Sequence, residues 1–168
     1  MPEGDAERGA PVISVYNRQR KLRPELAWLR RFATRALPEV LRQQPGPGEA
    51  PLPLLEEVEV SLVSDATIAR LHRDFMQIAG PTDVITFQHG EIVISTETAR
   101  ENAGLYARSV RDELALYLVH GLLHLYGYED GDPAEAARMH ELQESLLARC
   151  LGLPAAPAFD TPFAQPTE

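Results

Sequence analysis

The pattern of apolar and polar positions predicts four β-strands in this chain. Apolar residues alternate with polar or small ones over residues 12–16 and 57–63, which is the period of a half-buried strand. Two more runs rich in β-branched residues cover 84–87 and 92–94. The residues between these runs, 88–90, favour a hairpin-like connection or a longer excursion. We therefore expect the four strands to form a small sheet.

Five segments have apolar residues at helical spacing. They cover residues 24–42, a short stretch after Ser64-Asp65, and residues 96–107, 110–126 and 134–151. In the fourth segment the expected buried side consists of Leu114, Tyr117, Leu118, Gly121 and Leu125.

Proline and glycine mark where these helices are broken. Pro38 is expected to bend or interrupt the first helix. Gly80-Pro81 should end the second, whose apolar face carries Ile68, Leu71 and Phe75. Residues 44–53 contain four prolines and two glycines, which predicts a loop.

Length and composition fit one folded domain. The chain has 168 residues, of which 44% are hydrophobic, enough for one core. We place the domain at residues 11–151 and expect residues 1–10 and 152–168 to be disordered tails. Cys150 is the one cysteine, so no internal disulfide can form and we expect a reducing compartment, the cytoplasm. Because no leader opens the chain and no apolar run reaches the ~20 residues of a membrane span, no membrane partner is expected.

Charge is unevenly distributed along the chain. The formal net charge of −9 argues against general affinity for nucleic acids, whose binding depends on phosphate contacts. Residues 18–42 nevertheless hold eight of the 16 basic residues. This segment is either a basic face for an anionic partner or a solvated helix face that pairs with acidic neighbours.

The most informative stretch is His120-Gly-Leu-Leu-His124, followed by Gly127 and Asp130. Histidines four residues apart on a helix lie on one face and can bind one ion, and a glycine can then turn the chain back. The spacing is that of a metzincin zinc site with Asp in place of the third histidine. A zinc protease carries its general base, Glu, directly after the first histidine, whereas this chain has Gly121.

Two further residues near this motif are candidates. His140, on the last helix, is the rival of Asp130 as third ligand, since that helix must pack back across the site. Glu113 lies two helical turns before His120 and is either a residue that orients a ligand or a bound water, or a solvated charge.

These residues resemble the signature of the YbeY family, metal-dependent endoribonucleases of bacterial ribosomal RNA maturation, which runs H-G-x-L-H-L-x-G-Y-D-H. Residues 120–128 match it throughout. Residues 81–87 are similar to the family's P-T-D-V-L-S-F, and residues 90–95 to its G-D-I-x-I-S. The order and spacing fit from about residue 56 to 147. The resemblance implies an α+β fold, with a small mixed four-stranded sheet covered by about five helices and the metal site on a central helix.

The chain departs from the family pattern at two places. Asp130 stands where the family has its third histidine, which keeps a ligand atom but adds a negative charge, so the ion should be a weaker Lewis acid. Met76 stands where the family has an arginine thought to face the RNA. Arg73, one helical turn earlier, is either a substitute for it or a solvated charge.

The resemblance implies a zinc-dependent, single-strand-preferring endoribonuclease of ribosomal RNA maturation and ribosome quality control. His120, His124 and Asp130 would hold one Zn²⁺, and water bound to the ion would supply hydroxide or a base for the 2′-hydroxyl. The expected partners are ribosomal RNA or its precursor and the small ribosomal subunit. The alternatives are a hydrolase of peptides or amides that uses Glu113 as base, and a non-catalytic ribosome assembly factor with a structural metal.

Overall fold

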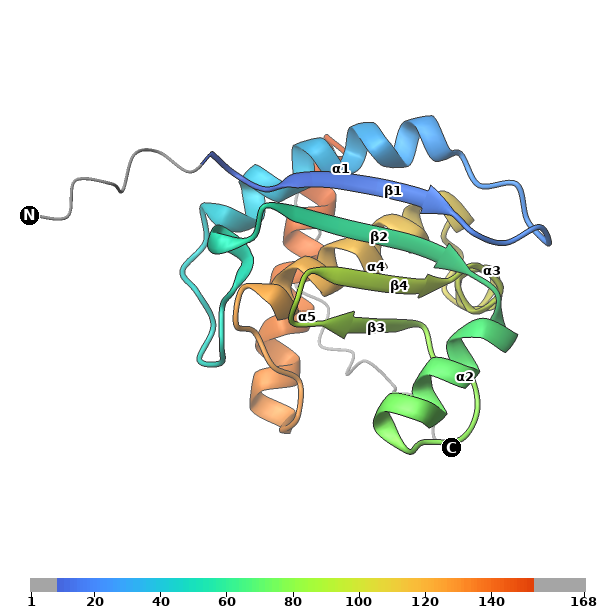
Figure 1. Ribbon diagram of the computed structural model, residues 1–168. Coiled ribbons are helices and arrows are strands. Elements are labelled where there is room, and N and C mark those ends of the chain that lie inside the picture. The colour runs from blue at the N-terminus through green and yellow to red at the C-terminus, as the bar shows by residue number, and fades with distance from the viewer. Residues whose placement is uncertain (1–8, 153–168) are drawn as a thin grey trace, which may run out of the picture.

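The computed structural model describes residues 9–152, so the predicted tails fall almost entirely outside the described residues. Strands and helices alternate irregularly around one sheet, and the expected α+β class is confirmed (Figure 1). The elements are β1 (Val12–Asn17), α1 (Leu26–Leu41), a 3-10 turn η1 (Leu52–Leu54), β2 (Glu57–Val63), α2 (Asp65–Met76), β3 (Val84–Phe87), β4 (Glu91–Ser95), α3 (Thr96–Leu105), α4 (Val110–Leu125) and α5 (Pro133–Cys150).

The sheet is mixed, with strand order β1-β2-β4-β3. β2 pairs in parallel with both β1 and β4, whereas β3 pairs antiparallel with β4. The expected β3–β4 hairpin is confirmed, because Phe87 faces Glu91 across a three-residue loop. Gly90 closes this loop with a φ of 109°, and its N–H donates to the carbonyl oxygen of Phe87 at 2.9 Å.

Helix α4 lies against one face of the sheet, in contact with α1, α3 and α5, and is buried on almost every side (Figure 1). The even-numbered residues of β2 and β4 point to this face of the sheet and form the main core with α1, α4 and α5. The predicted buried side of α4 was therefore too narrow, since Ala115, Leu116, Val119, Leu122 and Leu123 are buried as well. A helix packed against both a sheet and other helices loses its polar face.

The opposite face of the sheet carries a smaller cluster, made by Val63, Ile68, Ile85 and Val93, with α2 packed at one end. Helix α2 ends earlier than expected, at Met76, because Gln77 takes a left-handed conformation with φ 55°. Phe75 lies at the margin of the apolar face, because it is 63% exposed and its ring meets Phe87 of β3 only edge-on.

Pro38 does not interrupt α1, which runs without a break from Leu26 to Leu41. The proline is exposed, so the carbonyl group left without its helical N–H partner can turn toward water. Leu37 and Val40 on either side of it are buried in the core. Their packing offsets the missing hydrogen bond.

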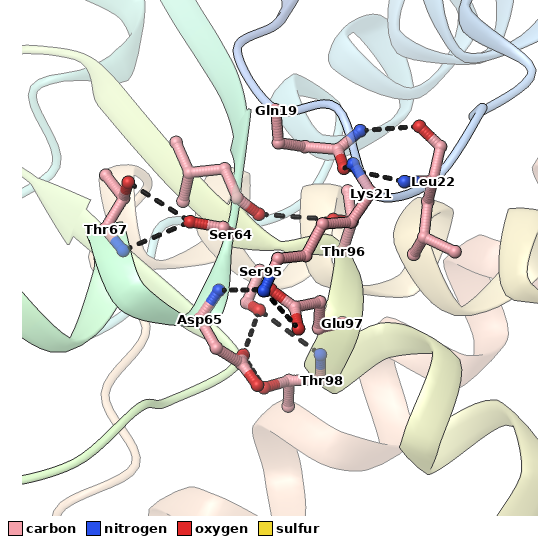
Figure 2. Close-up of polar contacts among 11 residues, drawn as sticks. Gln19, Lys21, Leu22, Ser64, Asp65, Thr67, Ser95, Thr96, Glu97 and Thr98 are labelled. Atoms are coloured by element: carbon pink, nitrogen blue, oxygen red, sulfur yellow. Dashed lines mark hydrogen bonds and ion pairs between the residues drawn. The ribbon is translucent and has the colours of Figure 1, made fainter.

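The helices that follow the neighbouring strands β2 and β4 are tied together at their first turns (Figure 2). The carboxylate of Asp65 accepts hydrogen bonds from the hydroxyls of Ser95 (2.5 Å) and Thr98 (2.7 Å). In return, Glu97 accepts from the backbone N–H of Asp65 at 3.0 Å. Each first turn thus satisfies polar groups of the other, which fixes α2 relative to α3.

Candidate metal centre

His120 and His124 point their Nε2 atoms at each other from the last two turns of α4. These atoms lie 3.0 Å apart, and the two rings are nearly perpendicular, at 83°. Their side chains are 26% and 23% exposed, so an ion can reach them from solvent. The i, i+4 spacing produces this convergence because both residues lie on the one face of α4 that the core leaves open.

The Nδ1 atom of His124 is occupied, which leaves its Nε2 free to ligate. Nδ1 donates to the carbonyl oxygen of Tyr128 at 2.9 Å, so the neutral ring carries its lone pair on Nε2. Burial, together with the neighbouring His124, lowers the pKa of His120 below its ordinary value of 6.5. The His120 ring is therefore neutral near pH 7, the form in which histidine binds metals.

Asp130 completes a group of three ligand atoms. Its Oδ2 lies 3.7 Å from Nε2 of His120 and 3.6 Å from Nε2 of His124. The three ligand atoms all lie within 4.8 Å of one another. Since ligands of a tetrahedral zinc ion are about 3.4 Å apart, the group fits one ion. The contact with His124 lowers the pKa of the Asp130 carboxyl, against the opposing effect of burial, so the group supplies an anion.

The turn that brings Asp130 back is held by residues far away in the sequence. Gly127 has a φ of 94°, and its N–H donates to the carbonyl oxygen of His124 at 3.1 Å. The N–H groups of Gly46 and Gly48 donate to the carbonyl oxygens of Tyr126 (2.9 Å) and Gly127 (2.8 Å). Residues 44–48, predicted only as a loop, therefore form a strap that fixes the turn before Asp130.

Two tyrosines of the turn donate hydrogen bonds in the opposite sense, to the end of α1 and to the segment that leads into the strap. Tyr126 is buried, and its hydroxyl shares its one hydrogen between the carbonyl oxygens of Leu41 (3.1 Å) and Gln43 (2.9 Å). The hydroxyl of Tyr128 donates to the carbonyl oxygen of Gln44. The glycines and prolines of the segment predicted no regular structure, and nothing in their local pattern gave the partner.

A sequence model of a protein family, described as "Endoribonuclease YbeY", matches residues 14–151. The chain belongs to this family. It is 36% identical over 115 residues to the endoribonuclease YbeY of Micrococcus luteus, covering 59% of this chain and 73% of the relative. It is 39% identical over 111 residues to that of Moorella thermoacetica, covering 55% and 71%.

A solved structure agrees with this assignment. The solution structure of TM1509 from Thermotoga maritima matches with a TM-score of 0.56 and 27% identity, over 84% of this chain and 90% of that one. The resemblance that the sequence motifs indicated is therefore confirmed for the family and for the fold.

Gly121, in the second position of the YbeY family motif, lies where α4 approaches the sheet most closely. A Cβ atom at this position would come within 2.6 Å of Cγ2 of Ile92 in β4. The position that carries the general base in zinc proteases therefore faces the sheet in this protein, where there is no room for a side chain. Any base for the reaction has to come from elsewhere.

Glu113 is buried, which excludes the interpretation as a solvated charge. It is 3% exposed, and its Oε2 has no hydrogen-bond partner in the described part of the chain. Arg108 approaches this atom at 3.7 Å. Burial raises the pKa of Glu113, and the smaller effects of Arg108 and Tyr117 lower it. Its role in orienting a ligand or a water stays a prediction.

The other candidates lie outside the cluster of three. Within residues 9–152, the group whose ligand atoms converge consists of His120, His124 and Asp130, without His140. Arg73 is exposed on α2 and pairs with the adjacent Asp74 at 3.1 Å. Met76, at the position of the YbeY family's arginine, is 49% exposed.

Proposed function

We propose that this protein is a metal-dependent endoribonuclease that prefers single-stranded RNA and acts in ribosomal RNA maturation and ribosome quality control. One observation carries the proposal: in a chain of the endoribonuclease YbeY family, two imidazole nitrogens and a carboxylate oxygen converge at the exposed end of a buried helix. Zn²⁺ is the ion that this donor set favours, because imidazole and carboxylate ligands on a helix and turn are typical of zinc sites.

The residues of the site would hold the ion and leave one of its positions open to water or substrate. His120 and His124 supply neutral nitrogen ligands, and Asp130 offsets one unit of the ion's charge. A bound divalent ion would polarise a phosphodiester oxygen and lower the pKa of water at its open position. With Gly121 packed against Ile92, the chain places no carboxylate directly after the first ligand. This favours phosphodiester cleavage over the base-assisted hydrolysis of peptides.

An acidic protein needs local positive charge to bind RNA. The bound ion supplies part of it, and the basic segment at residues 18–42 supplies another part. In this segment Arg30 is engaged by the fold, since its Nε donates to the carbonyl oxygen of Val15 at 3.1 Å. Arg31 and Arg35 are exposed on α1, which packs beside β1. We assign to them long-range attraction of RNA rather than contact with the cleavage site.

Ribosomal RNA or its precursor is the substrate, and the small ribosomal subunit the larger partner, that family membership favours. The cytoplasm is the compartment in which both occur. In residues 9–152 no helix combines the length and apolar character required to cross a membrane.

The experiment compares the wild type with His124→Ala and with the control His89→Ala. His89 is exposed and pairs with Glu91, outside the cluster. Elemental mass spectrometry should find about one zinc ion per chain in the wild type and in His89→Ala, and much less in His124→Ala, which keeps two ligands. The zinc-loaded wild type should cut RNA with single-stranded segments and leave duplex RNA and casein intact.

Other outcomes would select the alternatives. Cleavage of casein with intact RNA would indicate a peptide hydrolase. One zinc ion per chain without cleavage of either substrate, combined with unfolding on metal removal, would indicate an assembly factor with a structural metal.

A further inference from the structure

Gln143 is a polar residue on the buried face of α5. The buried positions of this helix are Met139, Gln143, Leu146, Leu147 and Cys150. Only 6% of Gln143 is exposed. Burying an amide costs free energy unless its oxygen and nitrogen are hydrogen-bonded, so a polar residue in an apolar stripe needs a specific partner.

Both ends of the Gln143 amide meet histidines. Its Oε1 lies 2.8 Å from Nδ1 of His120, and its Nε2 lies 3.5 Å from Nδ1 of His140. A carbonyl oxygen can only accept a hydrogen bond, so the shorter contact requires the proton of His120 to be on Nδ1. The amide nitrogen can only donate, so the contact with His140 keeps the oxygen turned toward His120.

We propose that Gln143 is a positioning residue of the metal centre, which accepts the Nδ1 hydrogen of His120 and so presents the Nε2 lone pair of that ring to the ion. Because the second nitrogen of a metal-binding histidine sets its tautomer and orientation, this contact acts on the ligand and not on the substrate. The inference rests on the proposed metal site, but it is independent of RNA being the substrate.

Loss of the acceptor would open a competing arrangement. The imidazole proton of His120 could move to Nε2, where it would donate to Nε2 of His124 across the 3.0 Å that separates them. An ion would have to displace this hydrogen bond before both rings could bind it. Zinc affinity should then fall, even though all three ligands are still present.

His140 acquires a role as well. This residue, the rival of Asp130 as third ligand, contacts the amide of Gln143 at the end opposite to His120. It therefore helps to hold the amide orientation from outside the group of ligands. His120, Gln143 and His140 form one connected line from α4 to α5.

The test compares Gln143→Met and Gln143→Glu, with Glu141→Gln as a control at an exposed position of the same helix. Methionine keeps the length and flexibility of glutamine but offers only a weak acceptor, its thioether sulfur, whereas glutamate keeps an acceptor oxygen. Gln143→Leu is a second apolar variant, used if the first does not fold by circular dichroism. Two properties are measured: the tautomer of His120 in the metal-free protein by long-range ¹H–¹⁵N spectra, and zinc affinity by competition with a chromophoric chelator.

We expect the His120 proton to be on Nδ1 in three proteins, which are the wild type and the variants Gln143→Glu and Glu141→Gln. Both variants should bind zinc at least as tightly as the wild type. In the apolar variant, the proton should move to Nε2 and zinc affinity should fall about 10- to 100-fold. A packing role predicts the reverse order, with methionine tolerated and the buried charge of glutamate harmful. The inference is overturned if the folded apolar variant keeps the wild-type tautomer and affinity.

These measurements separate the inference from the proposed function. RNA that stays uncut by a wild type with the expected tautomer and zinc affinity would overturn the function and leave the role of Gln143 intact. If Gln143→Met cut RNA and bound zinc with wild-type affinity, the role of Gln143 would be overturned and the proposed function would stand.

Discussion

The backbone N–H of Gly48 donates to the carbonyl oxygen of Gly127 at 2.8 Å, joining the strap of residues 44–48 to the turn that precedes Asp130. The reverse side of the contact is equally close, because a Cβ atom on Gly127 would lie 2.9 Å from the carbonyl oxygens of Gly46 and Gly48. The position of Asp130 therefore depends on a contact between segments that the sequence separates widely.

Gly127→Ala should destabilise the protein and weaken zinc binding together. The left-handed conformation costs a non-glycine residue about 1–2 kcal/mol, and the clash with the strap adds to this. Displacement of the turn should also move Asp130 away from the histidines. Gly131→Ala is the matched control, since a Cβ atom there meets nothing within 4 Å. Chemical unfolding and zinc titration measure the two effects, and equal results for both variants would show that the strap does not restrain the turn.

Asp130 is expected to be the third ligand. Asp130→Ala should lose much of the zinc affinity, while His140→Ala should keep the ion and change its affinity less. Asp130→His should bind zinc and move the alkaline rise of activity to lower pH, because a neutral ligand leaves one more unit of positive charge on the ion. Chelator competition and pH–rate profiles test this. Zinc retention by Asp130→Ala combined with zinc loss by His140→Ala would place the third ligand on α5.

Glu113 should make the folded protein less stable as pH rises. Burial raises its pKa above 4.5 in the folded state, so the folded protein keeps a proton that the unfolded chain releases. Below the pKa of the unfolded chain, Glu113 is protonated in both states and does not destabilise the fold. The destabilisation grows as pH rises from that pKa through the raised pKa of the folded state. The Tm of Glu113→Gln should therefore equal that of the wild type at about pH 4 and exceed it at about pH 7.5. Glu141→Gln, at an exposed position, is the control measured over the same pH range, and the same pH dependence in both variants would show that it does not come from the burial of Glu113.

Neutralising exposed arginines of α1 should weaken RNA binding and reduce its salt dependence. The slope of log K against log salt is negative, and each phosphate of single-stranded RNA that the protein no longer neutralises makes it shallower by about 0.7. The double variant Arg31→Gln with Arg35→Gln should therefore reduce the steepness by up to about 1.4. Arg42→Gln is the control, because Arg42 pairs with Glu39 at 2.5 Å. Binding measured at several salt concentrations decides between the alternatives. A salt slope equal to that of the wild type would mean that these arginines form only a solvated helix face.

Local pattern was sufficient for much of the fold. Period-two alternation predicted β1 and β2, and Gly90 at the end of a short connection predicted the β3–β4 hairpin. Local pattern failed where burial outweighed it. α1 continues through Pro38 because its neighbours are buried. Phe75 contacts the sheet only edge-on, through Phe87 of β3, and stays 63% exposed.

The sequence by itself determined the pair His120 and His124 and the turn at Gly127, because helical spacing and the conformational freedom of glycine are properties of neighbouring residues. It also determined the family, through motifs that lie in single short segments. The tertiary structure alone decided that the strap holds Gly127, that Glu113 is buried, and that Gln143 meets His120. These contacts join α4 to segments remote in sequence, and their geometry follows from how whole elements pack. The residues next to a position in the sequence therefore do not predict that packing.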